Sequence, residues 1–383
     1  MVIRQIKLGD FRNYPCVTFS PTEGITVFHG ANGAGKTNLL EAIHLCCLGR
    51  SHRTSQDREL IRQGSLCGSV QVQVMRNDGR REVRVMLWAQ QKRAKQILLN
   101  GKPAARIGEL MGHLNCVMFS PEDLELIKDG PALRRRFMDM QLSQLRPSYF
   151  FSLQKYVSTL NQRNALLRAM AAPGANKSPA GQLEVWDEQL AREGAAITDH
   201  RRWFAEILKE ESGKNYLHIS GSKEEIFEAQ YVGALSDADK LYEKMLEGLY
   251  KSRREDMRRC VTHFGPHRDD LHLTIKGQDM KNFASQGQMR TAALAMRLSQ
   301  LTMMKLETGE APVLLLDDVM SELDPRRRAL LLERIEGVQT FVTCTDRSDL
   351  SGAKAQAVVE VRLDKETGCA VLMDEQKAKA PST

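Results

Sequence analysis

The residues of this sequence that most clearly could do chemistry form a glycine-rich loop, residues 30–37 (GANGAGKT). They match the phosphate-binding loop pattern G-x-x-x-x-G-K-[ST] at every fixed position. Glycines let successive backbone N–H groups turn toward phosphate oxygens, and the N-terminus of a following helix adds a partial positive charge. In this pattern Lys36 reaches the β- and γ-phosphates of a nucleoside triphosphate, and the Thr37 hydroxyl holds Mg²⁺. The residues expected at the phosphates are Gly30, Ala31, Asn32, Gly33, Ala34, Gly35, Lys36 and Thr37.

The segments on either side of this loop have the character that such a site needs. Residues 24–28 are mostly β-branched and apolar, which is typical of a buried strand, and residues 38–48 have helical spacing. A strand, a glycine loop and a helix in this order favour a real phosphate site over a chance glycine turn.

A second set of chemical residues ends an apolar run far along the chain, at residues 313–318 (VLLLDD). A carboxylate at the end of a buried strand can hold Mg²⁺ through water, and we assign this role to Asp317. Asp318 is then placed to orient or deprotonate an attacking water. The alternative is a strand that merely ends at an acidic turn.

A third element precedes these acids, at residues 285–288 (SQGQ), where a long helix is expected to begin. A helix N-terminus that carries serine and glycine is a second anion site. A serine that only caps its helix is the alternative interpretation. Lys36 and Asp318 are the residues expected to take part in catalysis.

Composition restricts the class of protein. The chain has 383 residues, of which 42% are hydrophobic and 27% charged, as in globular proteins. It contains no run of about 18 apolar residues, and residues 1–11 lack a signal-peptide core, so we expect a cytoplasmic protein without a membrane partner. The eight cysteines include no C-x-x-C pair, which favours reduced thiols. A net charge of +7 permits a nucleic-acid partner without requiring one.

The order of expected elements indicates an α/β protein with an insert. Residues 2–19, 24–28, 69–75, 81–88 and 94–99 read as strands, and Asn100-Gly101 is a hairpin signal. Residues 132–170, 183–213 and 237–259 read as helices, and 216–232 as a short hairpin. Further elements are expected at 272–275, 285–307, 313–316, 325–336, 339–344, 358–363 and 369–373. We therefore expect an ATP-binding lobe at 1–124 and 261–383, and a mainly helical lobe with a short antiparallel arm at 125–260.

In their order and spacing, the phosphate loop, the SQGQ helix start, the acidic strand end and residues 321–324 resemble an ABC-type P-loop ATPase head. This resemblance implies a mixed sheet with an antiparallel subsheet and ATP as the nucleotide. In that family the signature helix of one subunit closes on the nucleotide held by the other, which implies an ATP-dependent homodimer. Ser285 and Gly287 would then face the partner's γ-phosphate, and residues 321–324 would match the D-loop. The resemblance thus implies that Ser285 takes part in catalysis and that Ser285, Gly287 and Gln288 contact nucleotide.

More of the chain resembles one branch, the RecF family of bacterial recombination mediators, which is related to the Rad50 and SMC heads. The motifs that carry this resemblance are residues 10–14 (DFRNY), 30–37, 51–54 (SHRT), 119–124 (FSPEDL), 134–139 (RRRFMD), 265–271 (GPHRDDL), 285–290 (SQGQMR) and 315–324 (LLDDVMSELD). The stretch 265–271 is the most specific, since general ABC proteins lack it. The short insert, broken by Pro173 and Pro179, also distinguishes the chain from the long coiled coils of SMC and Rad50.

This resemblance implies DNA binding, with double-stranded, gapped or single-strand junction DNA, together with a RecR partner and RecO in the wider pathway. It implies a role in recombinational gap repair, replication restart and SOS induction, by helping to load recombinase at gaps. No histidine follows the last core strand, 341–346, and residues 121–123 (PED) stand where a glutamine is usual. We infer slow, weak ATP hydrolysis that switches a clamp. An ABC-type subunit coupled to another protein without DNA, and a nucleotide-independent scaffold, are the alternatives.

Two further patterns leave alternatives open. Residues 263–272 contain His263, His267, Asp269, Asp270 and His272, which could be metal ligands or have a structural role. Arginines that could bind DNA phosphates or simply be solvated helix surface are Arg50, Arg53, Arg58, Arg134, Arg135, Arg136, Arg253, Arg254, Arg258, Arg259, Arg326, Arg327 and Arg328. With only 6% aromatic residues, base stacking on a single strand is not indicated.

Overall fold

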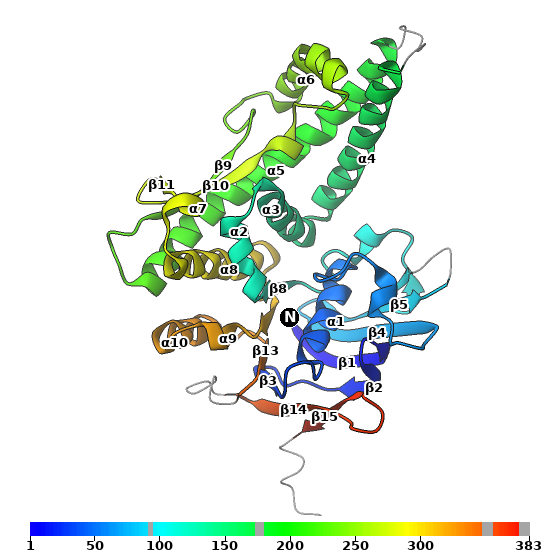
Figure 1. Cartoon of the computed structure of the whole chain (residues 1–383), viewed down its shortest axis with the longest axis vertical. Coiled ribbons are helices and arrows are strands. Elements are labelled where there is room, and N and C mark those ends of the chain that lie inside the picture. The colour runs from blue at the N-terminus through cyan, green and yellow to red at the C-terminus, as the bar shows by residue number, and fades with distance from the viewer. Residues whose placement is uncertain (91–94, 173–179, 347–354, 375–383) are drawn as a thin grey trace, which may run out of the picture. The chain divides into compact units, whose positions relative to one another are not determined.

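The structure is a computed structural model that describes residues 1–90, 95–172, 180–346 and 355–374. The chain divides into two compact units, each with its own core (Figure 1). Unit 1 consists of Met1–Asp123 and Arg297–Thr383, and unit 2 of Leu124–Met296. The α/β fold expected from the sequence, with a helical insert, is confirmed.

A six-stranded, mostly parallel sheet forms the centre of unit 1 and carries both chemical loops. Its strand order is β15-β14-β3-β13-β12-β8, and only β15 is antiparallel. The bounds are β3 (Ile25–His29), β8 (Cys116–Phe119), β12 (Val313–Asp317), β13 (Thr340–Cys344), β14 (Ala357–Leu363) and β15 (Ala370–Asp374). Because β13 lies between β3 and β12, the loops that follow these two strands emerge at the same edge of the sheet.

A second, antiparallel sheet in unit 1 has the order β2-β1-β4-β5-β6-β7. The bounds are β1 (Val2–Phe11), β2 (Tyr14–Phe19), β4 (Cys67–Arg76), β5 (Gly79–Trp88), β6 (Lys95–Leu99) and β7 (Lys102–Pro103). Its inward residues alternate along the strands, as in β4, where Val70, Val72 and Val74 are buried. The antiparallel subsheet predicted from the sequence is therefore present.

Helix α1 (Lys36–Leu48) contacts strands of both sheets, so it has no solvent face beyond its first turn. Every residue from 39 to 48 is buried, including the charged Glu41. Full burial of each leucine is worth about 1.5–3 kcal/mol, so this helix fixes the phosphate loop firmly to the core. Unit 1 also contains α9 (Val319–Glu322), α10 (Pro325–Arg334) and short 3-10 helices at Asp57–Leu60 and Ile107–Leu110, and a third 3-10 helix, Pro121–Leu124, runs into unit 2.

Unit 2 is mainly helical, and its arm is formed by α4 packed against the long helix α5, with α6 also on α5 (Figure 1). A three-stranded sheet of order β11-β10-β9 completes it. The bounds are α2 (Glu125–Lys128), α3 (Pro131–Leu145), α4 (Pro147–Met170), α5 (Ala180–Ser220), β9 (Phe227–Val232), α6 (Leu241–Arg259), β10 (Asp270–Ile275), β11 (Gln278–Asp279) and α7 (Met280–Phe283). Helix α8 (Gln286–Thr308) begins in unit 2 and ends in unit 1.

Two expected elements differ from the structure, each for a local reason. The helix expected over 132–170 is broken at Arg146, whose backbone is extended (φ −131°, ψ 97°), because Pro147 disfavours helical geometry in the residue before it. The hairpin expected over 216–232 does not form, since α5 continues to Ser220. Strand β9 instead pairs with β10, some forty residues later in the chain.

The boundaries of the compact units also differ from the expected lobes. The first falls at 123/124, close to 124/125, but residues 261–296 lie in unit 2 rather than with the ATP-binding lobe. The physical reason is the pairing of β10 with β9, which joins the segment after residue 260 to the helical unit. Over the described part of the chain, no helix is both long and apolar enough to cross a membrane.

Candidate nucleotide site

The phosphate loop has a backbone that only glycine adopts easily at three positions, Gly30, Gly33 (φ +80°) and Gly35. Gly30 has φ +148°, and a side chain there would overlap the carbonyl oxygen of Val361. Gly35 has φ +115°, and a Cβ there would lie 2.7 Å from the Asn13 amide. The loop therefore wraps tightly at the N-terminus of α1, as the sequence predicted.

Lys36 is buried, and its ammonium group lies inside the curve of the loop. Its Nζ donates to the carbonyl oxygens of Gly30 at 2.7 Å and Ala31 at 3.0 Å. Burial lowers the pKa of Lys36, while the carboxylates of Asp318 and Asp317 oppose that shift. A cation held here, facing two acids, is suited to phosphate oxygens.

Thr37 and Asp317 meet although they are far apart in sequence. The Thr37 hydroxyl donates to Asp317 Oδ1 at 2.8 Å, and the Thr343 hydroxyl donates to the same oxygen at 2.7 Å. A hydroxyl beside a carboxylate at a strand end provides the hard oxygen donors that Mg²⁺ prefers, so these residues fit that ion. Thr343 was not identified from the sequence. It could have been found from its place near the end of β13, the strand that lies between β3 and β12.

Asp318 is held in an unusual conformation directly after β12. Its backbone is left-handed (φ 54°, ψ 21°), its N–H donates to Thr343 Oγ1 at 2.9 Å, and its carbonyl accepts from Ser321 Oγ at 2.8 Å. A non-glycine residue in this region is uncommon and marks a position that the surroundings define.

These residues line one pocket of about 260 Å³ in unit 1. The lining residues are Asn32, Gly33, Gly35, Lys36, Thr37, Asn38, Arg53, Asp317, Asp318 and Thr343. The structure thus brings together the predicted phosphate loop and the predicted acidic strand end.

Residues 10–14 hold the backbone of this loop through side-chain hydrogen bonds, a role that was not predicted from the sequence. Asn13 Nδ2 donates to the carbonyl of Ala34 at 3.0 Å, and the buried Tyr14 hydroxyl donates to the carbonyl of Gly35 at 3.1 Å. Asn38 Nδ2 donates to Asn13 Oδ1, and Arg53 Nη1 donates to Asn38 Oδ1. A chain of side chains therefore links an arginine of the pocket to the loop backbone.

Buried Glu41 anchors the same region from within α1. Arg12 donates to both of its carboxylate oxygens, at 2.7 and 2.8 Å, and Ser51 donates to one of them. Burial alone would raise the pKa of Glu41, but the hydrogen bonds from Arg12 and Ser51 lower it below its usual value. The motifs DFRNY and SHRT are thereby joined through a single carboxylate.

The predicted signature residues lie in unit 2, at the start of α8. Ser285 is exposed, its Oγ accepts from Gln288 N at 3.3 Å, and Gln288 Oε1 accepts from Ser285 N at 2.9 Å. This reciprocal pair is a capping box, so the helix start is preformed. Gln288 Nε2 also donates to Glu225, and the carbonyl of Gly287 accepts from Thr291.

The segment 265–271 packs into a buried polar network of unit 2. Arg201 donates to the carbonyl of Pro266 at 2.6 Å and to Asp139 at 2.7 Å. Arg134 binds Asp270 through two bonds of 2.8 Å. Among the residues that the structure describes, no three His, Cys, Asp or Glu side chains could together hold a metal. The histidines and acids of this segment instead have separate partners, such as His263 with Asp256 and His267 with Tyr156.

The arginines predicted to bind DNA phosphates divide into those that contact other groups of the chain and those that make no ion pair with a described residue. Carboxylates or carbonyls of the same chain engage Arg134, Arg135, Arg253, Arg258, Arg259, Arg327 and Arg328. The pairs of Arg258 and Arg259 with Glu255 are exposed. Arg58 donates to Gln56. Arg136, Arg254 and Arg326 are exposed and make no ion pair with any residue that the structure describes. For Arg134, Arg135 and Arg253 the sequence alone cannot make this distinction, because their partners come from distant segments.

Comparison with known proteins places this geometry in a family. Residues 2–368 match the family model described as the RecF/RecN/SMC N-terminal domain. A protein of Acetivibrio thermocellus named DNA replication and repair protein RecF is 42% identical over 352 residues, which is 91% of this chain and 94% of the relative.

Solved structures agree with this relationship. The structure of the recombination mediator protein RecF–ATP of the RecFOR pathway is similar with a TM-score of 0.87 and 36% identity, covering 97% of both chains. An SMC head domain from Pyrococcus furiosus, bound to a domain of ScpA, has a TM-score of 0.58 and 17% identity over 98% of this chain and 97% of its own. That second likeness concerns the fold alone, the ABC-type ATPase head.

Proposed function

The chain belongs to the RecF family, and on that premise we propose that it is an ATP-dependent DNA-binding protein of recombinational repair. ATP with Mg²⁺ closes two copies into a clamp on DNA, and hydrolysis is slow. The clamp acts at gapped or single-strand junction DNA, with RecR as a partner and RecO in the same pathway, and helps load recombinase. Gap repair, replication restart and SOS induction are the processes it serves.

The meeting of Thr37 and Asp317 is the observation that carries the nucleotide part of this proposal. It puts the hydroxyl and carboxylate expected to hold Mg²⁺ within 2.8 Å, beside the ammonium of Lys36 in one pocket. Lys36 neutralises β- and γ-phosphate oxygens, and Asp318 positions or deprotonates the attacking water. A structure of a 36% identical RecF–ATP protein supports ATP as the nucleotide.

The preformed start of α8 supports the homodimer. Its capping box presents Ser285 at an exposed helix N-terminus, where an anion is favoured. We assign this end to the γ-phosphate held by a second copy, with Ser285, Gly287 and Gln288 as its contacts. Dimerisation then requires nucleotide, because the triphosphate supplies the charge that both surfaces bind.

The exposed arginines support a DNA backbone contact. Arg136, Arg254 and Arg326 keep their charge available, so each phosphate they neutralise releases counterions. We propose affinity without sequence preference, since backbone contacts carry no base information.

Molar mass in solution, with and without saturating ATP·Mg²⁺, tests this function. We expect the wild type to double its mass with ATP, and Lys36→Arg and Ser285→Arg to remain monomeric. Ser285→Arg should still bind ATP, which separates loss of dimer from loss of nucleotide. A wild type that stays monomeric at saturating ATP·Mg²⁺ overturns the clamp. DNA affinity should rise with ATP and fall steeply between about 50 and 200 mM salt.

A further inference from the structure

The side chain of Gln288, at the start of α8, is oriented by partners on two sides. Its Oε1 accepts from the N–H of Ser285 at 2.9 Å, and its Nε2 donates to Oε1 of Glu225 at 2.9 Å. A backbone N–H can only donate and a carboxylate can only accept, so only one orientation of the Gln288 amide satisfies both partners. Glu225 therefore determines how this capping side chain meets Ser285.

Glu225 lies in the short connection between α5 and β9, and its carboxylate is itself held in place. Its Oε2 accepts from the hydroxyl of the buried Tyr216 at 2.9 Å, so each carboxylate oxygen has a partner. The Tyr216 ring stacks on Phe227, with 5.4 Å between the ring centroids. The side chain that orients Gln288 is thus anchored to the core of unit 2.

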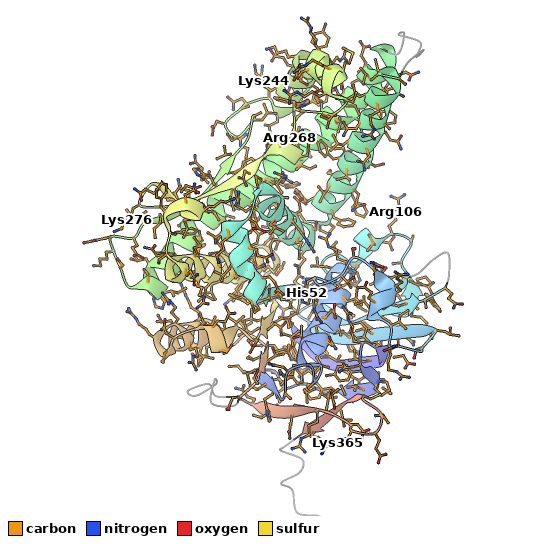
Figure 2. The ribbon with its side chains drawn as sticks, viewed as in Figure 1. His52, Arg106, Lys244, Arg268, Lys276 and Lys365 are labelled. Atoms are coloured by element: carbon orange, nitrogen blue, oxygen red, sulfur yellow. The ribbon has the colours of Figure 1, made fainter. Side chains whose placement is uncertain are left out.

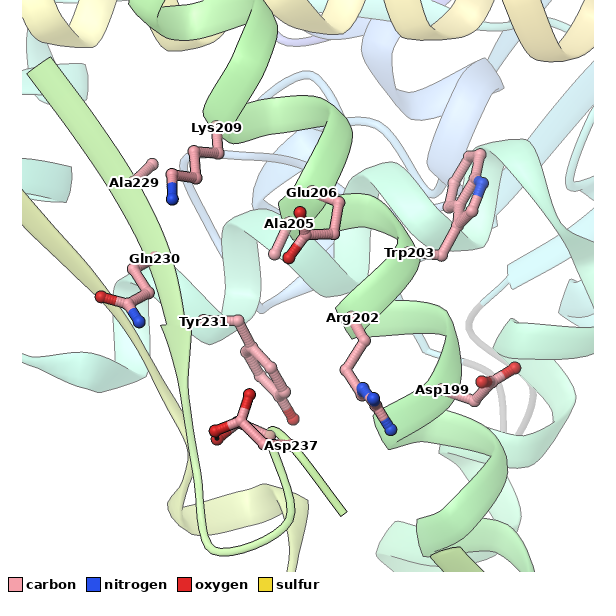
Figure 3. A pocket seen from close by; sticks show the side chains of 11 residues that line it. Asp199, Arg202, Trp203, Ala205, Glu206, Lys209, Ala229, Gln230, Tyr231 and Asp237 are labelled. Atoms are coloured by element: carbon pink, nitrogen blue, oxygen red, sulfur yellow. Dashed lines mark hydrogen bonds between the residues drawn. The ribbon is translucent and has the colours of Figure 1, made fainter. Parts of the chain in front are cut away.

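The backbone around Glu225 is held as well. The N–H of Lys276, which is labelled in Figure 2, donates to the carbonyl of the next residue, Ile226, at 2.9 Å. Helix α5 and strand β9, on either side of the connection, pack on each other, and residues of both, such as Arg202 and Tyr231, line one cavity of about 530 Å³ (Figure 3). Because both flanking elements are fixed, the Glu225 carboxylate is presented to α8 from a defined position.

The capping box also directs the hydroxyl of Ser285. The Ser285 Oγ accepts from the N–H of Gln288 at 3.3 Å. An oxygen that accepts in this way keeps its own hydrogen for another partner, and an anion beyond the helix start can be that partner. Glu225 therefore acts on the group assigned to the γ-phosphate through Gln288.

A carboxylate beside an anion site is unfavourable in charge, because like charges repel. What Glu225 contributes is position, since both of its oxygens accept hydrogen bonds. A glutamine in its place can accept from Gln288 through its oxygen and donate to the Tyr216 oxygen through its nitrogen. Glutamine therefore keeps both hydrogen bonds and removes the charge, whereas alanine removes both.

We propose that Glu225 is a positioning residue of the composite ATP site. It holds Gln288 so that Ser285 of one copy is aligned with the γ-phosphate held by the other copy. This inference rests on the ATP-dependent dimer of the proposed function. It gives the connection between α5 and β9 a role in closing the dimer, whereas the phosphate loop of the same copy binds ATP without it.

The test compares the full chain with its variants Glu225→Ala and Glu225→Gln and with a matched control, Glu224→Ala. Glu224 is the adjacent acid, and its pair with Lys276 at 3.9 Å is an exposed one that contributes little. Three quantities are measured. They are hydrogen exchange of residues 284–289 without nucleotide, binding of a fluorescent ATP analogue to dilute monomer, and the dissociation constant of the dimer at saturating ATP·Mg²⁺.

We expect Glu225→Ala to speed exchange at 284–289 and to weaken the dimer, each roughly tenfold or more, because it removes a hydrogen bond to a charged group. Its affinity for ATP as a monomer should equal that of the wild type. Glu225→Gln and Glu224→Ala should stay within about threefold of the wild type in all three measurements.

The inference is overturned if Glu225→Ala leaves exchange at 284–289 or the dimer unchanged, or if it weakens ATP binding by the monomer as much as it weakens the dimer. Glu225→Gln behaving like Glu225→Ala also overturns it, because charge rather than position would then be what matters. A wild type that stays monomeric at saturating ATP·Mg²⁺ overturns the proposed dimer and this role with it. Exchange without nucleotide still shows in that case whether Glu225 holds the start of α8, so the two failures are distinguishable.

Discussion

The hydroxyl of Thr37 donates to Asp317 across 2.8 Å, although 280 residues separate the two along the chain. Thr37 lies in the first turn of α1 and Asp317 ends β12, and β13 lies between the strands that lead to them. In the proposed function, these two residues together hold Mg²⁺.

Replacing Thr37 by valine, which keeps the shape and removes the hydroxyl, tests this pairing. We expect the stimulation of ATP binding by Mg²⁺ to fall roughly tenfold or more, because a hydrogen bond to a charged group is worth about 1.5–3 kcal/mol. Thr37→Ser should retain most of it. A fluorescent ATP analogue titrated with and without Mg²⁺ measures the effect. Equal Mg²⁺ dependence in the valine variant and the wild type would contradict the assignment.

The substitution Asp318→Asn tests whether Asp318 is needed for ATP hydrolysis but not for ATP binding. Asparagine tolerates the left-handed backbone found at this position, so the fold should be retained. We expect ATP binding and ATP-dependent dimerisation to persist while hydrolysis slows about 100-fold or more, because a general base contributes 10²–10⁴-fold. Asp317→Asn should instead weaken Mg²⁺-dependent binding. Single-turnover ATP hydrolysis measures the rate, and an unchanged rate in Asp318→Asn would exclude this residue as the base.

Gly30 and Gly33 should respond differently to alanine. Both have positive φ, but a side chain at Gly30 would overlap the carbonyl of Val361, whereas nothing lies within 4 Å of one at Gly33. Gly33→Ala should cost only backbone strain of about 1–2 kcal/mol. Gly30→Ala should cost more and also displace the loop from the adjoining strand β14. Thermal melting and ATP affinity compare the two variants. If the two alanine variants melt at the same temperature, close packing against Val361 is not what requires glycine.

Arg163 is the buried centre of an ion network in the arm. It is fully buried and bonds Asp187 and Asp256, both at 2.7 Å. Arg163→Met should destabilise the protein by about 3–5 kcal/mol, because it leaves buried carboxylates without their partner. Arg258→Met, which breaks an exposed pair with Glu255, should leave the urea midpoint unchanged. A loss below about 1 kcal/mol for Arg163→Met would mean that Arg253 and His263 suffice for the two acids.

His267 should make stability sensitive to acid. Its Nδ1 accepts from the Tyr156 hydroxyl at 2.7 Å and its Nε2–H donates to the Thr262 carbonyl at 3.0 Å. Burial lowers the pKa of His267 to about 4, whereas an unfolded histidine titrates near pH ~6.5. The unfolded chain therefore takes up a proton first as the pH falls.

Stability from this neutral histidine is fully present above pH ~6.5 and is lost as the pH falls toward about 4. The slope is about 1.4 kcal/mol per pH unit for one such group. Urea unfolding at a series of pH values measures it, and His267→Gln should show a slope smaller by that amount. Parallel pH curves for the two proteins would show that His267 already titrates normally in the fold.

Much of this protein can be predicted from sequence where the signal is local. The phosphate loop, the strand before it, the acidic end of β12 and the capping box of α8 each follow from adjacent residues with fixed backbone requirements. Their order along the chain was enough to indicate an ABC-type head of the RecF family. The break at Arg146 was also encoded, in Pro147, although the helical period around it concealed the break.

Only the tertiary structure decided which distant residues meet. Thr343 reaches Asp317 because sheet order places β13 beside β12, and strand order is not a local property. Asn13, between β1 and β2 of the antiparallel sheet, reaches the phosphate loop that follows β3 of the other sheet. The partner of β9 is β10 rather than a neighbour in sequence for the same reason. Arginines that look alike in sequence differ because the half-buried carboxylate of Asp270, from a distant segment, engages Arg134 but not Arg136. Local geometry thus fixed the chemistry of each motif, and long-range packing fixed which motifs share a site.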